Sequence, residues 1–526
     1  MLHISKPGRS RPLAVSAAVL LAMSLPLQAQ TPQQATGSPA QYSAVPVSSA
    51  QIDHAVANLD ALAADILERS GIPGLAVAVV RDGVTVYARG FGLRRIDADL
   101  PVDADTAFLL ASLSKPIGAT VVATQVSAGV VEWDTPLVDL LPWFSLSDEW
   151  VTRHLTIGDL YAHRSGLPDH AGDELEDLGY ARRQVLERLA LLPLAPFRAS
   201  YAYTNFGMTA AAEGVAVAAG TDWASLSRRA LYEPLGMTAT SSLNAEFMAR
   251  ANRASSHVPV EGGYAVADLR QPDAQSPAGG VSSSVNDVAR WMALILEGGA
   301  PLIAADALLP AVSPQAIASP PGTMDARGGT YGYGFNVGVQ PSGRVMLSHS
   351  GAFALGAGTT VSMIPSLGVG IVVLTNASPL GAAEAISATF MDEVQFGHST
   401  RDWFAAYRPM ISALMAPVGH LVGAERPETA APPRATAAYV GTYQNAYFGP
   451  AEVIEQDGGL ALVLGPNRQI ELLTPWDGDA FTYLPYSENA SDGSVSEVGF
   501  AAFTDEQAQE MRIEHLDEFG LGTFRR

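Results

Sequence analysis

A serine and a lysine three residues apart, Ser112 and Lys115, are the pair in this chain with the clearest chemical potential. Apart from Lys6, Lys115 is the only lysine in 526 residues, and the other 29 of the 31 basic residues are arginine. Arginine can replace lysine on a solvated surface, but its guanidinium stays protonated, whereas a desolvated lysine amine can act as a base. Residues i and i+3 share one face of a helix. The spacing therefore predicts a nucleophilic hydroxyl beside a basic amine at the start of a helix.

The alternative is a helix cap next to a surface lysine, because S-x-x-K is a short pattern. Residues further along the chain must decide between a catalytic pair and a helix cap. Tyr203 and Asn205 stand two apart in a loop before an alanine-rich segment, and His349 and Gly351 stand on a predicted strand. Each of these pairs is uninformative alone. A histidine on a strand is more often structural than catalytic, although Gly351 would let a substrate backbone approach closely.

The elements that must position these residues can be located from periodicity. Apolar residues at helical spacing from Ile52 to Ile66 predict a long N-terminal helix. Two β-branched runs flank Asp82-Gly83, which is a strong hairpin signal. Residues 359–364 and 370–376 predict adjacent antiparallel strands, and residues 120–330 are mostly helical. An acidic run from Asp169 to Asp177 predicts a solvated face, with the flank of a cleft entrance as the alternative.

Composition limits the partners and the chemistry. The net charge of −22 argues against nucleic acid and anionic lipid as partners. The chain has no cysteine, which excludes disulfides and thiolate catalysis, and its ten histidines show no metal-ligand spacing. We therefore expect no metal and no cofactor. Oligomeric state is not predicted.

The chain divides into segments of different composition. Residues 1–29 have a basic start, an apolar run and a small-residue end, which predicts a secretory signal peptide and a periplasmic or secreted protein with no membrane span after cleavage. The alternative, a membrane anchor, would need a longer run. We expect the following further segments: a flexible lead-in at 30–48, a large domain of helices and strands at 49–415, a Pro/Ala-rich linker at 416–436 and a small all-β barrel at 437–526.

Taken together, the three short motifs resemble the serine β-lactamase and penicillin-binding-protein superfamily, in the branch of class C β-lactamases, D,D-carboxypeptidases, D-aminopeptidases and related esterases. Four other segments resemble that family's habitual sequences, namely 163–168 (His-Arg-Ser-Gly-Leu-Pro), 233–237, 277–281 and 370–376. The resemblance covers about residues 50–395. It implies an α/β (α+β) β-lactamase/transpeptidase-like fold, an antiparallel sheet flanked by helices with a helical lobe. The tail from 437 resembles a lipocalin-like domain.

The resemblance also implies an acyl-enzyme mechanism. Ser112 would attack a carbonyl, Lys115 would activate it, and Tyr203 would be partner base and proton shuttle to the leaving group. Asn205 would hold the substrate amide or the lysine. The backbone N–H groups of Ser112 and Ala352 would form the oxyanion hole.

One departure from the family pattern bears on the substrate. Where β-lactamases have K-T-G, this chain has His349-Ser350-Gly351, so a fixed cation is replaced by a group that is mostly neutral at pH 7. This argues against β-lactamase activity. Within the family, H-x-G resembles the D,D-peptidases and D-aminopeptidases. This resemblance favours amide hydrolysis of small peptides that are D-configured or otherwise unusual, with ester hydrolysis second. A penicillin-binding or peptidoglycan-sensing protein with negligible turnover is the third hypothesis.

Overall fold

The computed structural model describes residues 38–526. Residues 38–42 contain one 3-10 turn, η1 (Pro39–Gln41), and every other described element lies in a second unit, residues 43–526. The predicted signal peptide falls outside the described residues. No helix within residues 38–526 combines the length and the apolar character needed to cross a membrane.

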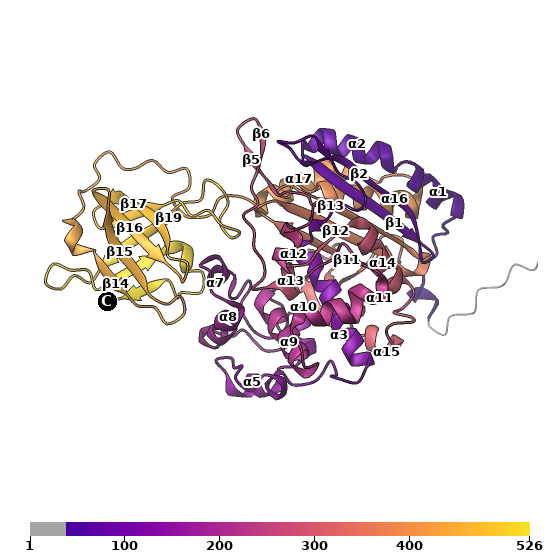
Figure 1. The fold of residues 1–526 in the computed structure, drawn as a ribbon, viewed down its shortest axis with the longest axis horizontal. Coiled ribbons are helices and arrows are strands. Elements are labelled where there is room, and N and C mark those ends of the chain that lie inside the picture. The colour runs from indigo at the N-terminus through magenta and orange to yellow at the C-terminus, as the bar shows by residue number, and fades with distance from the viewer. Residues whose placement is uncertain (1–37) are drawn as a thin grey trace, which may run out of the picture. The chain divides into compact units, whose positions relative to one another are not determined.

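A nine-stranded antiparallel sheet organises the larger part of this unit (Figure 1). The order is β3-β2-β1-β13-β12-β11-β10-β9-β8, so the first strands pair with the last ones through β1 and β13. The strands are β1 (Gly74–Arg81), β2 (Val84–Arg95), β3 (Leu100–Pro101), β8 (Ala316–Ser319), β9 (Gly329–Tyr331), β10 (Asn336–Val339), β11 (Val345–Phe353), β12 (Ala357–Ile364) and β13 (Val369–Thr375).

The predicted hairpin and strand pair are both present. Asp82 and Gly83 have φ values of 48° and 76°, the left-handed conformation of a tight hairpin turn between β1 and β2. β12 and β13 pair antiparallel over their whole lengths. Along β1, alternate side chains enter two separate cores, because successive side chains of a strand point to opposite faces.

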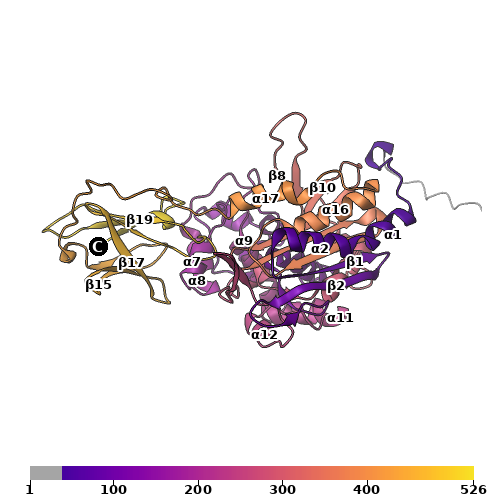
Figure 2. The same ribbon diagram turned by 90° about the horizontal axis from the view of Figure 1, so that it is seen from above.

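Helices cover both faces of the sheet (Figure 2). On one face lie α1 (Ser49–Ala57), α2 (Leu59–Ser70), α16 (Ala382–Phe396) and α17 (Trp403–Leu414). The prediction of one long N-terminal helix was wrong, because the segment forms two helices that meet at Asn58, whose side chain donates to Glu393 at 3.2 Å. On the other face, α14 (Val285–Leu296) packs against β1 and β13.

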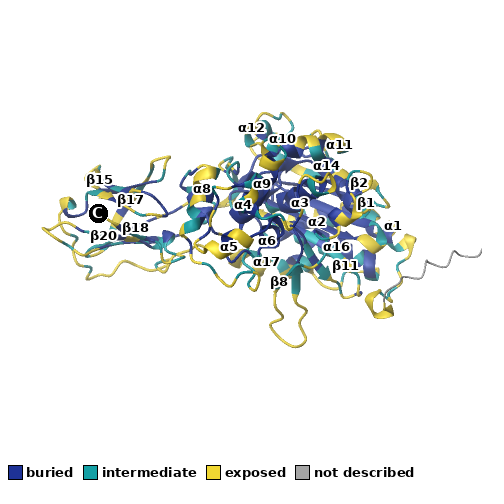
Figure 3. Ribbon diagram, turned by 90° about the horizontal axis from the view of Figure 1, so that it is seen from below, coloured by how far each residue is buried: buried dark blue, intermediate teal, exposed yellow. Residues whose placement is uncertain are grey.

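A helical lobe follows on that second face. Its central helix, α3, is buried along its first eleven residues and has no polar stripe, as expected of a helix enclosed on all sides (Figure 3). The lobe and its connections comprise α3 (Ser114–Ser127), α4 (Leu137–Leu140), α5 (Glu149–His154), α6 (Ile157–Tyr161), α7 (Asp173–Asp177), α8 (Arg182–Arg188), α9 (Asn205–Ala218), α10 (Trp223–Ser227), α11 (Glu233–Leu235), α12 (Asn244–Met248), α13 (Ser276–Gly279), α15 (Ala305–Leu308) and the short pairs β4 (Phe108–Leu109) with β7 (Ser282–Ser283) and β5 (His257–Val260) with β6 (Gly263–Val266).

Residues 441–525 form an eight-stranded antiparallel meander in which each strand pairs with the next. A bridge between Gln444 and Arg525 joins its two ends, so the sheet is a nearly closed barrel and the predicted barrel is confirmed. The strands are β14 (Gly441–Tyr443), β15 (Ala451–Gln456), β16 (Gly459–Leu464), β17 (Gln469–Asp477), β18 (Ala480–Tyr483), β19 (Ser496–Ala501), β20 (Glu510–Ile513) and β21 (Thr523–Arg525).

Candidate active site

Ser112 lies in a tight 3-10 turn, η2 (Ala111–Leu113), immediately before α3. Ala111 adopts a positive φ of 47°, a strained conformation for alanine that costs about 1–3 kcal/mol and that only surrounding packing can hold. Part of that packing comes from β11, because a Cβ added to Gly351 would stand 2.3 Å from the carbonyl oxygen of Leu110 and 2.9 Å from the Ser112 nitrogen. Gly351 is therefore needed for the strand to approach the serine turn, and not only for a substrate.

Lys115 is fully buried and has three oxygen atoms within hydrogen-bonding distance. Its Nζ lies 2.6 Å from Asn205 Oδ1, 3.0 Å from the carbonyl oxygen of Ala278 and 3.1 Å from Ser112 Oγ. The spacing of Ser112 and Lys115 predicted this meeting of hydroxyl and amine on one helical turn.

Burial lowers the pKa of Lys115 to about 7, with Asp173 acting in the opposite direction. A neutral amine has two N–H donors and one lone pair. Asn205 Oδ1 and the Ala278 carbonyl can only accept, so they use the two N–H groups. The lone pair is then left for the hydroxyl proton of Ser112, which is the arrangement a base requires.

Tyr203 completes the cluster from the other side. Its hydroxyl donates to Ser112 Oγ at 2.8 Å, and its ring centroid is 4.4 Å from Lys115 Nζ. Burial raises the pKa of Tyr203 above its ordinary value, so the phenol is protonated at rest. The neutral phenol is therefore favoured over a tyrosinate that would share the charge of Lys115.

The turn at residues 163–168 holds the loop that carries Tyr203. His163 accepts from the Thr204 amide at 3.1 Å through Nδ1, and its carbonyl accepts from the Ala202 amide at 3.0 Å. Asp169 accepts from the Tyr203 amide at 2.6 Å. Backbone hydrogen bonds on both sides of Tyr203 therefore fix the direction of its side chain.

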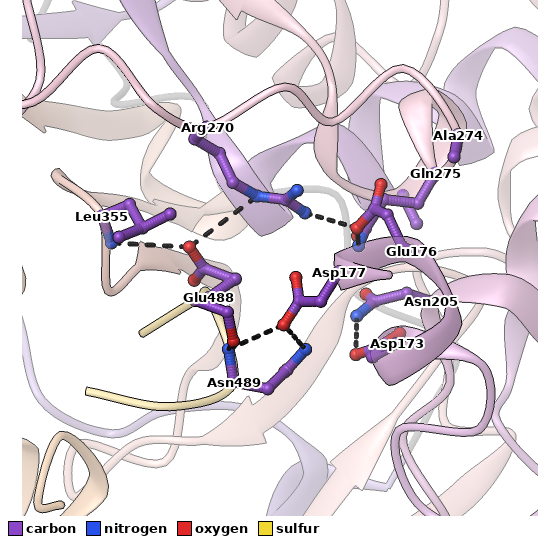
Figure 4. A network of polar contacts seen from close by, with 12 residues as sticks. Asp173, Glu176, Asp177, Asn205, Arg270, Ala274, Gln275, Leu355, Glu488 and Asn489 are labelled. Atoms are coloured by element: carbon purple, nitrogen blue, oxygen red, sulfur yellow. Dashed lines mark hydrogen bonds and ion pairs between the residues drawn. The ribbon is translucent and has the colours of Figure 1, made fainter. Parts of the chain in front are cut away.

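Asn205, the first residue of α9, connects Lys115 to a second polar group. Its Nδ2 donates at 2.7 Å to Asp173 (Figure 4). Asp173 also pairs with His170 Nδ1 at 2.8 Å. Of the two roles left open for Asn205, the structure shows contact with the lysine. Because Asp173 only accepts, it fixes the amide with its oxygen toward Lys115.

The prediction of a solvated acidic face at Asp169–Asp177 was wrong for the middle of that run. Asp173 and Glu174 are buried on α7, and Glu174 lines the cavity next to Ser112. The alternative, a run that flanks a cleft, describes the structure better. The sequence analysis gave no role in the site to Asp173 or His170. The available signal was the acidic run itself, which is the last cluster of carboxylates before the Tyr203 loop.

The end of β11 presents a strand edge to the site. Residues Val345–Ser348 pair with β10, but His349–Phe353 pair with β12 alone among the described strands. Ser350, Gly351 and Ala352 line the cavity. The edge therefore offers backbone groups beside the Ser112 turn, in the place where the predicted oxyanion donor Ala352 stands.

His349 lies behind this edge and is not one of the described residues that line the cavity. Its Nδ1 donates to its neighbour Ser350's carbonyl at 2.7 Å and its Nε2 accepts from the Tyr331 hydroxyl at 2.9 Å. Burial lowers its pKa to about 3, so the ring is neutral. The neutral ring agrees with the prediction that this chain has no fixed cation at this position. The geometry gives no support to direct contact between His349 and a substrate.

The cavity has a volume of about 760 Å³ and is lined both by the serine cluster and by residues of the barrel. The barrel loop at 485–491 reaches the β11–β12 turn, where Glu488 accepts from the Ala354 amide at 2.7 Å. Arg270 Nε lies 3.7 Å from Glu488 Oε2, and Asn489 Nδ2 donates to Asp177 Oδ2 at 2.8 Å (Figure 4). Nothing in the sequence had indicated that barrel residues enter the site.

Comparison with known proteins now identifies the family. Residues 59–396 match the family described as Beta-lactamase, and residues 425–521 match a domain of unknown function, DUF3471. The first match spans most of the chain, so the chain belongs to the beta-lactamase family, and it is a serine hydrolase. The likeness of the barrel to lipocalins stays a prediction.

Three individual proteins illustrate the relationship. Unguisins hydrolase ungD' of Aspergillus campestris is 29% identical over 325 residues, which cover 59% of this chain and 59% of that protein, less than two thirds of its length. Esterase EstB of Burkholderia gladioli is 28% identical over 378 residues, covering 64% of this chain and 94% of the esterase. The octameric penicillin-binding protein homologue from Pyrococcus abyssi shares the fold with a TM-score of 0.57 at 20% identity, covering 90% of this chain and all of that one.

Proposed function

We propose that this chain is an exported hydrolase that cleaves amide bonds of small or unusual peptides, D-configured ones included, through an acyl-enzyme on Ser112. The observation that carries the proposal is the hydrogen-bonded cluster of Ser112, Lys115 and Tyr203 beside an open strand edge. Such a cluster has no purpose in a protein that only binds its ligand.

The contacts support a specific order of proton transfers. Lys115 takes the Ser112 proton as Oγ attacks the carbonyl carbon, and the N–H groups of Ser112 and Ala352 hold the oxygen that becomes negative. Tyr203 donates its proton to the leaving nitrogen as the C–N bond breaks, and the proton that Lys115 took from Ser112 then returns to the phenolate, so that both groups are neutral again. Water then attacks the acyl carbon, with the same proton transfers in reverse order. The bond between the acyl carbon and Oγ breaks, Oγ regains its proton, and the acid is released.

The strand edge at His349–Phe353 favours a peptide over a simple ester. An extended peptide can add to an open edge with its own N–H and C=O groups, whereas a small ester has no such row of groups. Ester hydrolysis is the second candidate, because Esterase EstB is among the relatives.

A fluorophosphonate probe and a substrate panel test the proposal on the purified protein. The panel holds p-nitrophenyl esters and D- and L-aminoacyl p-nitroanilides. We expect the probe to label Ser112 and the anilides to turn over. Turnover of esters alone would favour the esterase, and labelling without turnover of either would favour a penicillin-binding or sensing protein.

A further inference from the structure

The cavity is acidic in a way that the proposed chemistry does not use. Five glutamates line it, and no lysine or arginine does so among the described residues. Three of the five have assigned partners in the fold. Glu488 caps the β11–β12 turn, Glu514 pairs with His420 at 2.8 Å, and Glu384 contacts Ser350.

The remaining two glutamates, Glu174 and Glu518, come from different parts of the fold and line the same cavity. Glu174 belongs to α7 and is only 7% exposed, yet its Oε2 has no hydrogen-bond donor among the described residues. Glu518 follows β20 in the barrel, is exposed and lines the same cavity, close enough that burial and this carboxyl together raise the pKa of Glu174. Two carboxyl groups that meet in this way repel each other unless a proton or a cation lies between them.

Neighbouring groups do not supply that cation. His170 belongs to the lining set, and although burial acts against its charge, the hydrogen bond between its Nδ1 and Asp173 at 2.8 Å raises its pKa to about 9, so this cation is already paired with Asp173. His515, the other histidine of the lining, has its pKa lowered by burial and is neutral. Burial and the neighbouring carboxyls raise the pKa of Glu174 to about 8, so a proton occupies the pair while no cation is bound.

We propose that Glu174 and Glu518 form a subsite for a primary ammonium group of the substrate. An ammonium has three N–H donors and no acceptor, and two carboxylates from opposite walls match it better than they match any neutral group. The inference rests on the proposed function, since it names the substrates of the same site as peptides with a free amine. The amine belongs either to the peptide's N-terminus or to a basic side chain, and both present the same group.

Three p-nitroanilides separate these sources: those of D-alanine, N-acetyl-D-alanine and N-acetyl-D-lysine. We expect at least one amine-bearing substrate to have a kcat/KM about tenfold above that of N-acetyl-D-alanine, which a net interaction of about 1.4 kcal/mol provides. The better amine-bearing substrate identifies the source. In Glu518→Gln, and in the isosteric Glu174→Gln, the preference should vanish mainly through KM, while N-acetyl-D-alanine anilide is cleaved as before.

Glu506→Gln is the matched control, because Glu506 is an exposed glutamate of the same barrel that does not line the cavity. Equal kcat/KM values for all three anilides, or a preference that survives Glu518→Gln, would overturn the subsite.

A second measurement does not depend on turnover. D-alaninamide should protect Ser112 from the fluorophosphonate probe better than N-acetyl-D-alaninamide does, and Glu518→Gln should remove the difference. If the anilides are not cleaved but this difference is seen, the proposed peptidase activity fails and the subsite stands. If they are cleaved and the difference is absent, the subsite alone fails.

Discussion

The two walls of the cavity are built differently. On the hydrolase side Lys115 is fully buried, and its three oxygen partners lie between 2.6 and 3.1 Å from Nζ. On the barrel side Glu518 is exposed, and the loop at 485–491 is attached through a few side chains such as Asn489. Buried, fully hydrogen-bonded groups are pre-organised, whereas exposed ones rearrange easily.

This difference suggests a division of tasks. Bond cleavage needs fixed positions, because misplacement by about 1 Å can cost about a hundredfold in rate. Selection among substrates needs only a difference in binding energy at the rim. Changes on the hydrolase side should therefore act on kcat, and changes on the barrel side on KM.

The largest effect is expected for Ser112→Ala. Without the hydroxyl no acyl-enzyme forms, so kcat should fall at least about 10³-fold, and fluorophosphonate labelling should disappear. The measurement is steady-state turnover of the best panel substrate, with circular dichroism to show that the fold is retained. Residual activity near the wild-type rate would mean that another group attacks the substrate.

Lys115→Arg should be nearly as damaging, although it conserves the charge. A guanidinium cannot give up its proton at these pH values, and its planar fork does not fit the three oxygen atoms that surround Nζ. Burst-phase kinetics of acylation would locate the loss in the first step. An active arginine variant would remove the role of base from Lys115.

Gly351→Ala should lower kcat by about a hundredfold, because the new Cβ would displace the Ser112 turn from the position that catalysis needs. Gly338→Ala on the neighbouring β10 is the control, since its Cβ would meet nothing closer than 3.9 Å. Kinetics of both variants, with melting temperatures, check the comparison. Equal effects in the two would show that β11 does not position the serine.

Gly351 also shows what the sequence could and could not predict. The spacing of Ser112 and Lys115 and the runs of β-branched residues are local signals, and they indicated the helix start, the hairpin and the strand pair. The reason for Gly351 is a contact between segments more than 200 residues apart, which no local pattern contains. The same holds for Asp173 and for Glu518, because their roles arise only when α7 and the barrel meet at the cavity.

The pH dependence of kcat/KM should follow the amine of Lys115. Its pKa is lowered to about 7, and the neutral form is the base, so activity should rise with pH and level off above about 7. Below that value kcat/KM should fall about tenfold for each pH unit. A profile measured from about pH 5 to about pH 9 tests this, and a flat acid side would point to a different base.

The smallest effect is expected on the barrel side, for Asn489→Ala. The substitution removes the 2.8 Å hydrogen bond to Asp177, and such a bond to a charged group contributes about 1.5–3 kcal/mol. Because this hydrogen bond attaches the barrel loop to α7 and Asn489 touches no reacting atom, KM for a peptide anilide should rise by less than about tenfold, with kcat unchanged. Hydrolysis of p-nitrophenyl acetate, which reaches only the serine side, should not change at all in this variant. Gln507→Ala, at an exposed barrel residue, is the control, and it should change the kinetics of neither the anilide nor the acetate. If Asn489→Ala instead lowered kcat for the acetate, the barrel would be positioning the catalytic groups, and the division between the two walls would be wrong.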